Sequence, residues 1–170
     1  MYNKPNGRLE VVCGPMFSGK SEELIRRIKR AVIANRPHHL FKPDIDDRYS
    51  LDHVASHSGV KMACQPIKTA QDIKNALSHS EPCLVGIDEC QFLGTEVIDV
   101  IKDLLTRGFR VVVAGLDLDS QTEPFHPMPT LLAMADNVDK LKAVCARCGE
   151  DAVLTYRTAP VEDKVFVGAA

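Results

Sequence analysis

Residues 14–21 form the stretch that decides the fold: Gly14-Pro15-Met16-Phe17-Ser18-Gly19-Lys20-Ser21. This is the pattern of a phosphate-binding loop, in which glycines let backbone N–H groups turn toward a phosphate, a lysine supplies positive charge and a serine offers its hydroxyl to magnesium. An apolar run at residues 9–13 precedes the loop, and apolar residues recur at helical spacing over residues 24–32. The pattern predicts a strand, a loop and a helix whose positive end faces a phosphate. The alternative is a glycine-rich turn that binds nothing.

Length and composition predict one main domain. The chain has 170 residues, and 21 Lys and Arg against 23 Asp and Glu leave a net charge of −2. The chain therefore lacks the excess of basic residues that would indicate a nucleic-acid polymer or an acidic membrane as a partner. Residues 1–8 lack the apolar core of a secretion signal, and the apolar run near Val111 is too short to span a membrane. We expect a cytoplasmic protein whose six cysteines are reduced thiols or metal ligands.

Strand and helix patterns alternate after the loop. Strands are expected at residues 39–42, 83–87 and 110–116, helices at 69–79 and 96–107, and a polar loop at 43–59. This alternation predicts an α/β fold with a mostly parallel sheet covered by helices. From residue 141 onward, short β-like runs that include residues 153–156 and 165–167 predict a small β-ribbon. We therefore expect domains at residues 1–140 and 141–170. The basic residues expected on the exposed face of the first helix are Arg26, Arg27, Lys29 and Arg30.

Two of the apolar strands end in acids. Asp88 and Glu89 follow the run at residues 83–87, and Asp117 follows the run at residues 110–116. Ligands of parallel sheets lie beyond the carboxyl ends of the strands, so these acids and the phosphate loop should converge on one cleft. Asp88 fits an acid that holds magnesium directly or through water, although a helix cap would also place an acid there. Glu89 fits a general base that orients an acceptor hydroxyl or activates water, and spacing alone does not separate a kinase from a hydrolase.

Several motifs, in one order along the chain, resemble the cytosolic-type or type II thymidine kinase family. They are residues 14–24, 41–43, 46–50, 56–57, 86–92, 114–117, 124–125 and 140–148. The resemblance implies a RecA-like P-loop core and transfer of the ATP γ-phosphate, with magnesium, to the 5′-hydroxyl of thymidine or deoxyuridine. This reaction is a salvage route to thymidine nucleotides for DNA synthesis. The resemblance also implies a homotetramer, feedback inhibition by thymidine triphosphate, and neither a nucleic-acid polymer nor a membrane as a partner.

The resemblance further implies roles for individual residues. Lys20 and the rest of the loop from Gly14 to Ser21 would hold phosphates, and the magnesium residues would be Ser21, Asp88 and Asp46. Glu89 would take the proton of the 5′-hydroxyl, and Arg48 would steady the transferring phosphoryl group with its planar guanidinium. A thymine 5-methyl group is worth only about 1 kcal/mol in an apolar pocket, so thymidine should be weakly favoured over deoxyuridine. The residues implied around the nucleoside are Met16, Phe92, Leu116, Phe125, Phe166, Val167 and Gly168.

Cys145 and Cys148 have the Cys-x-x-Cys spacing of half a zinc site. In the family a second pair completes this site beneath a long loop called the lasso, and structural zinc needs four ligands. We favour a chain cut short inside the lasso, and a naturally shortened protein or a site completed by a neighbouring chain are the alternatives. A redox pair is a further alternative. An incomplete lasso predicts that ATP binds better than the nucleoside.

Two positions depart from the family pattern. Ser120 stands where many relatives have an aromatic residue, and Cys90 follows the catalytic glutamate, where alternation predicts a buried, inert thiol.

Two other functions stay open on the sequence. One is a P-loop ATPase module of a nucleic-acid motor, which DNA-stimulated ATP hydrolysis would reveal. The other is a regulatory nucleotide-binding protein whose Glu89 has no acceptor.

Overall fold

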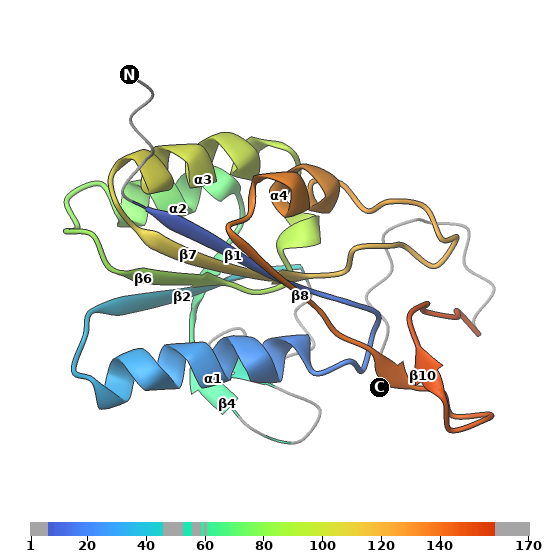
Figure 1. Ribbon diagram of the computed structural model, residues 1–170. Coiled ribbons are helices and arrows are strands. Elements are labelled where there is room, and N and C mark those ends of the chain that lie inside the picture. Colours follow the sequence, from blue (N-terminus) through green and yellow to red (C-terminus); the bar gives the residue numbers. More distant parts are fainter. Residues whose placement is uncertain (1–6, 46–52, 56–58, 60, 159–170) are drawn as a thin grey trace.

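A six-stranded parallel sheet forms the centre of the protein. The computed structural model describes residues 7–45, 53–55, 59 and 61–158. The sheet has the order β5-β2-β6-β7-β1-β8, and all its neighbouring strands are parallel (Figure 1). The prediction of an α/β fold with a mostly parallel sheet is confirmed. The strands are β1 (Arg8–Cys13), β2 (His38–Pro43), β5 (Gln65–Ile67), β6 (Leu84–Ile87), β7 (Arg110–Gly115) and β8 (Asn137–Lys140).

Helices cover both faces of this sheet. One helix, α1, lies on one face, and α2, α3 and α4 lie on the other (Figure 1). Each face has its own apolar core: Val12 packs on the α1 side, and Leu9 and Val11 pack on the opposite side. Successive side chains of a strand point to opposite faces, so the apolar residues of β1 contribute to both cores. The helices are α1 (Lys20–Ile33), α2 (Ala70–Ala76), α3 (Glu96–Thr106) and α4 (Met128–Met134).

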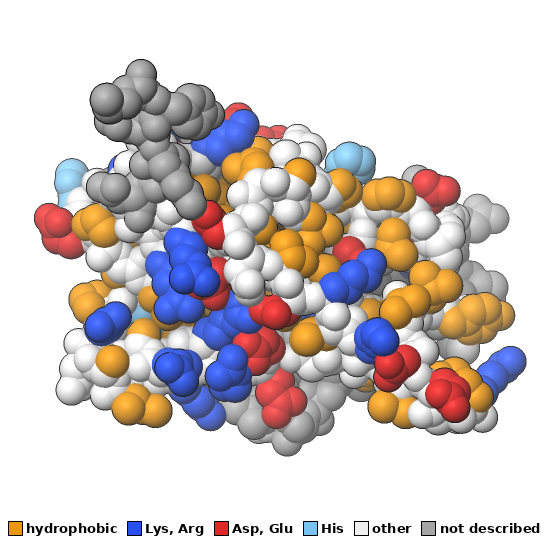
Figure 2. All heavy atoms as spheres, in the orientation of Figure 1, with side chains coloured by type: hydrophobic (Ala, Val, Ile, Leu, Met, Phe, Trp, Pro, Cys, Tyr) orange, Lys and Arg blue, Asp and Glu red, His pale blue; other side chains and the backbone are white. Residues whose placement is uncertain are grey.

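Arg27 on α1 corrects a prediction, because its side chain is 8% exposed and does not lie on the solvent face. Its guanidinium donates to Glu10 Oε2 at 2.7 Å and to Glu23 Oε1 at 2.8 Å, and it also bonds Asp139 on β8. The ion pairs of Arg27 therefore connect α1 to β1 and to β8. Figure 2 shows basic and acidic side chains intermixed on the face of the protein that it presents. The other basic residues that we expected to be exposed on α1 are exposed: Arg26, Lys29 and Arg30.

Five short elements, β3, β4, β5, α4 and β8, were not predicted from the sequence patterns. The predicted polar loop at residues 43–59 contains β3 (His53–Ala55), which pairs with β4 (Lys61–Ala63) in an antiparallel hairpin, and its Val54 is buried in the core on the α1 side. The patterns also indicate neither α4 nor β8. With seven residues, α4 is too short to show a clear helical period. Strand β8 lies at the sheet edge, and three of its four residues are exposed, so it lacks an apolar run.

The predicted β-ribbon is smaller than expected. Strands β9 (Ala143–Val144) and β10 (Asp151–Ala152) pair antiparallel, whereas residues 153–156 are not a strand and residues 165–167 lie outside the described residues. The Leu141 N–H donates to Cys13 O at 2.8 Å, so the segment after β8 begins in contact with the sheet. The domain division between residues 140 and 141 stays a prediction. Among the described residues, no helix has the length and apolar character needed to cross a membrane.

Candidate active site

The sequence-predicted site residues lie at the carboxyl edge of the sheet. The phosphate loop follows β1, Asp88 and Glu89 follow β6, and Asp117 lies two residues beyond the end of β7. Strands β6, β7 and β1 are consecutive neighbours in the parallel sheet, so their carboxyl ends share one edge. The chain runs from β1 through α1 to β2 on one side of β1, and from β7 through α4 to β8 on the other side. Connections that lead in opposite directions open a ligand crevice in α/β proteins.

The phosphate loop requires glycine at two positions. Gly14 has φ +146°, and a Cβ on it would lie 2.5 Å from Leu141 O, so no larger residue fits. Gly19 has φ +85° and caps the start of α1 in the left-handed region, which glycine enters without steric cost. The loop thus leads from the buried β1 into α1 within six residues, with the helix N-terminus directed at the loop.

Lys20 is folded back across this loop. Its Nζ donates to Pro15 O at 2.6 Å, and the side chain is buried. Burial lowers the pKa of Lys20 below its ordinary value, although the charges of Glu89 and Asp88 act in the opposite direction. The ammonium group therefore lies within electrostatic reach of the acid pair. A bound phosphate offers a better acceptor than a carbonyl, because a hydrogen bond between two charged groups is the stronger kind.

Asp88 links the acid pair to the phosphate loop. Ser21 Oγ donates to Asp88 Oδ1 at 3.2 Å, and Asp88 is 3% exposed. Burial, followed by the charge of Glu89, raises the pKa of Asp88 to about 7. A serine hydroxyl beside a carboxylate is the set of hard oxygen ligands that magnesium takes when it also keeps waters and phosphate oxygens. Ser21 and Asp88 therefore fit the magnesium that a kinase using ATP requires.

Glu89 has an unusual backbone and a firmly held side chain. Its φ is +49° and its ψ is +39°, and it precedes the short 3-10 helix η1 (Cys90–Phe92). Gln91 Nε2 donates to Glu89 Oε2 at 2.6 Å, and the Leu116 N–H donates to Gln91 Oε1 at 3.1 Å. A non-glycine residue in the left-handed region stores strain on the order of 1–3 kcal/mol, and such strain concentrates at functional sites. Cys90 next to it is fully buried, as predicted, and burial raises the pKa of its thiol well above the ordinary value.

Two of the four predicted nucleoside residues within the described chain are in direct contact. The rings of Phe92 and Phe125 meet edge to face, with centroids 5.9 Å apart and planes at 88°. The Phe125 N–H donates to Asp117 O at 2.9 Å, so the chain after β7 returns to the end of that strand. Leu116 reaches the same region through its N–H bond to Gln91. The departure at Ser120 lies within this returning turn and is half-buried.

Asp117 contributes a second buried carboxylate to this edge. Its Oδ2 is 2.8 Å from Lys140 Nζ at the end of β8, and its side chain is 5% exposed. Its Oδ1 is buried without a hydrogen-bond partner among the described residues. Asp117 also raises the pKa of Lys20, against the larger effect of burial. The charge of Asp117 therefore also acts on the phosphate loop.

Several predicted residues lie outside the described residues, and the sequence patterns missed others. Thr155, from the chain beyond β10, accepts the Met16 N–H at 3.0 Å and so joins that segment to the phosphate loop. No local pattern signals it, because a lone threonine in a polar stretch has no spacing to read. Gln91 could have been suspected from its place two residues after Glu89. The predicted residues outside the described chain are Asp46, Arg48, Phe166, Val167 and Gly168.

The cysteine pair forms a tight turn between β9 and β10. The Gly149 N–H donates to Cys145 O at 2.8 Å, and backbone N–H groups of Cys148 and Arg147 lower the pKa of the Cys145 thiol. A lowered thiol pKa favours the thiolate, which is the metal-binding form. In the part of the chain that is described, no group of three or more His, Cys, Asp or Glu side chains is placed to hold a metal ion. These two thiols alone do not fit a four-ligand structural zinc site.

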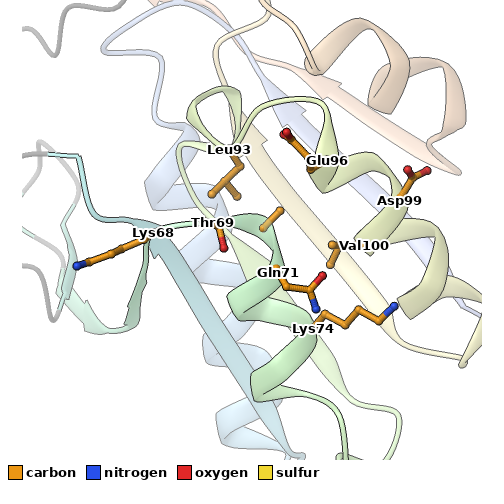
Figure 3. Close-up of a pocket in the computed structure, with 9 residues that line it drawn as sticks. Lys68, Thr69, Gln71, Lys74, Leu93, Glu96, Asp99 and Val100 are labelled. Carbon is orange, nitrogen blue, oxygen red and sulfur yellow. The ribbon is translucent and has the colours of Figure 1, made fainter.

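A separate cavity of about 560 Å³ lies between α2 and α3. Figure 3 shows Lys68, Glu96 and Asp99 around it. It contains neither the phosphate loop nor the acid pair, and charged side chains on its rim point in different directions. We therefore place the active site at the carboxyl edge of the sheet, where the chemically competent groups meet, and not in this cavity.

A parallel sheet with a phosphate loop after its first strand, and with a buried aspartate and an adjacent glutamate beside that loop, defines a P-loop nucleotide-binding protein. The model of the thymidine kinase family matches residues 7–170. Proteins named thymidine kinase from Bacteroides thetaiotaomicron and Bacteroides fragilis are each 48% identical over 162 residues, which is 95% of this chain and 80% of theirs. This chain belongs to the thymidine kinase family, and the sequence-based prediction of that family is confirmed.

Among solved structures, the cytoplasmic domain of the Thermomonospora curvata type VII secretion ATPase EccC has a TM-score of 0.45 and 17% identity to this chain. The match covers 89% of this chain and 24% of that one, and this likeness is too weak to bear on function.

Proposed function

We propose that this member of the thymidine kinase family transfers the γ-phosphate of ATP to the 5′-hydroxyl of thymidine at the carboxyl edge of the sheet. The observation that carries the proposal is the 3.2 Å contact between Ser21 Oγ and Asp88 Oδ1. It brings the phosphate loop up to the acid pair. Because Glu89 is the next residue, the same contact supports a role for Glu89 as general base close to the bound phosphates. The family does not favour the two alternatives, a nucleic-acid motor module and a regulatory nucleotide-binding protein.

The donor half of the site consists of the loop from Gly14 to Ser21. Its backbone N–H groups and the N-terminus of α1 bind the phosphate oxygens, and Lys20 exchanges its bond to Pro15 O for one to phosphate. Ser21 and Asp88 would hold magnesium, with Asp46 ordering a bound water. Magnesium, when bound, neutralises charge on the phosphates. Deprotonated Asp88 is needed for this role, and loss of the proton from Asp88 on binding is favoured by the incoming positive charge.

The acceptor half consists of Glu89 and the aromatic pair. Glu89 takes the proton of the 5′-hydroxyl as that oxygen bonds to the γ-phosphorus, and the bond to the β-phosphate oxygen breaks to release ADP. Arg48 steadies the transferring group. Phe92 and Phe125 pack against the thymine with Met16 and Leu116, a lining that supports the proposal because their rings already meet. Beyond the described residues, Phe166, Val167 and Gly168 would close over the base.

The wider setting is also a proposal. We expect the protein to act in the cytoplasm as a homotetramer, to accept deoxyuridine as a weaker substrate, and to be inhibited by thymidine triphosphate. The P-loop core is expected to be RecA-like and to span residues 1–140. Cys145 and Cys148 are proposed as two of the four ligands of a structural zinc, the other two coming from outside the described residues.

The test is product identification after incubation with magnesium-ATP and a panel of thymidine, deoxyuridine and deoxycytidine. Thymidine monophosphate and ADP should form in equal amounts, with thymidine favoured over deoxyuridine by about fivefold, the effect of about 1 kcal/mol. Glu89→Gln should lower kcat at least about 100-fold and leave the KM for ATP unchanged. Glu81→Gln, an exposed residue before β6, is the matched control.

Two outcomes would contradict the proposal. ATP hydrolysis stimulated by DNA, with no nucleoside monophosphate formed, would indicate a motor. Full turnover by Glu89→Gln would show that Glu89 is not the general base, even if thymidine is the substrate.

A further inference from the structure

We infer that Gln91 is a positioning residue, which holds the Glu89 carboxylate in the orientation needed to take the acceptor proton. The inference rests on the proposed role of Glu89 as general base. Gln91 lies in η1 and is 3% exposed, so its amide is removed from solvent. A buried amide has to satisfy both its N–H groups and its oxygen within the protein. The hydrogen-bond partners of Gln91 therefore indicate which groups its side chain positions.

The orientation of the Gln91 amide is fixed by its two partners. The Leu116 N–H is a donor, so the group that faces it at 3.1 Å has to be the oxygen, Oε1. Glu89 Oε2 is an acceptor, so the group that faces it at 2.6 Å has to be the nitrogen, Nε2. Exchanging oxygen and nitrogen would break both bonds. The chain of bonds runs from the backbone at the end of β7, through the amide, to the carboxylate at the end of β6.

Packing leaves the amide little freedom to move. A Cβ on Gly115 would lie 2.8 Å from Gln91 Oε1 and 2.9 Å from Met128 Sδ, so the amide oxygen fills space that only glycine leaves open. Gln91 is thereby held between β7 and α4. A side chain locked by packing can hold its partner to the narrow tolerance that catalysis requires.

Glu89 needs such support because its backbone does not provide it. Glu89 has a left-handed backbone conformation and lies between the end of β6 and η1, where neither a strand nor a helix fixes the direction of its side chain. A short hydrogen bond from Gln91 to the charged Oε2 is of the strong, charge-assisted kind. With Oε2 held, Oε1 is the oxygen directed to the acceptor hydroxyl. Gln91 does this without touching the reacting atoms.

A merely structural role for Gln91 would be to hold the Leu116 N–H and the turn after β7. The two roles use different atoms of one amide, so they can be separated. Gln91→Glu keeps the size of the side chain and an oxygen for the Leu116 N–H but has no N–H to give to Glu89. Gln91→Met keeps the length without charge and removes both bonds. Gln71→Met, an exposed glutamine on α2, is the matched control.

The experiment measures kcat and the KM for ATP and thymidine for these variants, alone and combined with Glu89→Gln. Thermal unfolding of each variant confirms that it is folded. Gln91→Glu and Gln91→Met should both lower kcat by about 10- to 100-fold, the worth of a hydrogen bond to a charged group, with the KM for ATP unchanged. In the Glu89→Gln background, Gln91→Met should lower the residual kcat by less than about threefold, because the group that it positions is already gone.

Four results would contradict either the role of Gln91 or the role of Glu89 on which it rests. Wild-type turnover by Gln91→Met, which has no donor for Glu89, would show that the bond to Glu89 is irrelevant to turnover. Equal losses from Gln91→Met in the wild-type and Glu89→Gln backgrounds would show that Gln91 acts independently of Glu89. Full activity of Glu89→Gln would instead remove the general-base assignment, whereas an inactive Glu89→Gln beside fully active Gln91 variants would remove only the present inference.

Discussion

Asp88→Asn should stabilise the protein without its ligands while abolishing turnover. Asp88 is buried beside Glu89, and its pKa is raised from the ordinary 3.8 to about 7. Asparagine has the same shape and keeps an oxygen for the Ser21 hydroxyl, which donates to Asp88 Oδ1 at 3.2 Å. The substitution therefore removes the buried negative charge and little else. A stability gain combined with a loss of function is expected where a residue is retained for chemistry.

The sign and size follow from proton binding. Between pH 3.8 and about 7 the folded state holds the Asp88 proton and the unfolded state does not, so the free energy of unfolding falls as pH rises. The full penalty above pH 7 is about 4 kcal/mol, from about three pH units at about 1.4 kcal/mol each. About 2 kcal/mol of it develops between pH 5.5 and pH 8. Below pH 3.8 both states are protonated and the penalty disappears.

Urea unfolding without magnesium or nucleotide, at pH 5.5 and at pH 8, measures this difference. The gain in unfolding free energy from Asp88→Asn should be about 2 kcal/mol larger at pH 8 than at pH 5.5, and both gains should be positive. Asp99→Asn, which removes a carboxylate that is 87% exposed on α3, measures the effect of net charge together with the loss of a surface ion pair to Lys102. A gain that is equal at the two pH values, after this correction, would refute the reasoning about the buried charge.

Two further substitutions test the packing that carries the site. Gly86→Ala in β6 should lower the free energy of unfolding by about 1–3 kcal/mol in urea, because its Cβ would lie 2.8 Å from Leu40 Cδ1 and 3.0 Å from Ile28 Cδ1; unchanged stability would mean that the α1 core accommodates a methyl group. Arg27→Ala should cost about 1.5–3 kcal/mol, the worth of a hydrogen bond to a charged group, since the buried Glu10 carboxylate loses one partner and keeps Arg110. Exposed Arg26→Ala is its control and should change the urea midpoint little, and equal effects of the two would contradict the role of burial.

The phosphate loop and the central strands could be predicted because their signals are local. Glycines, a lysine and a serine at fixed spacing specify one backbone path. The strand before Asp88 is fully apolar, and the strand before Gly14 is mostly so, because both faces of the sheet are covered. Because each acid follows a strand of the parallel sheet, the sequence also predicted that the acids lie together at the carboxyl edge of the sheet. These inferences need only the rule that parallel strands end on the same side of a sheet.

Residues whose position depends on distant partners could not be predicted in this way. Arg27 fits the exposed face of a helix by its spacing, and only Glu10 on β1 and Asp139 on β8 explain its burial. Strand β8 gains its place from pairing with β1, and not from its own mostly exposed residues. Thr155 reaches the phosphate loop from 139 residues away. In each case the decisive contact joins segments that are remote in sequence, which local periodicity does not register.

The left-handed backbone at Glu89 explains how two adjacent acids could serve the two substrates of the proposed reaction. In a continuing strand, consecutive side chains would point to opposite faces of the sheet, and the second would be lost to the site. The turn at φ +49° ends that alternation at the tip of β6. Asp88 then meets Ser21 of the phosphate loop, and Glu89 meets Gln91, which is anchored on β7. In the proposed reaction, one peptide unit thus separates the group assigned to the donor phosphates from the group assigned to the acceptor hydroxyl, and the strain at Glu89 is the local consequence of keeping both carboxylates at the same edge.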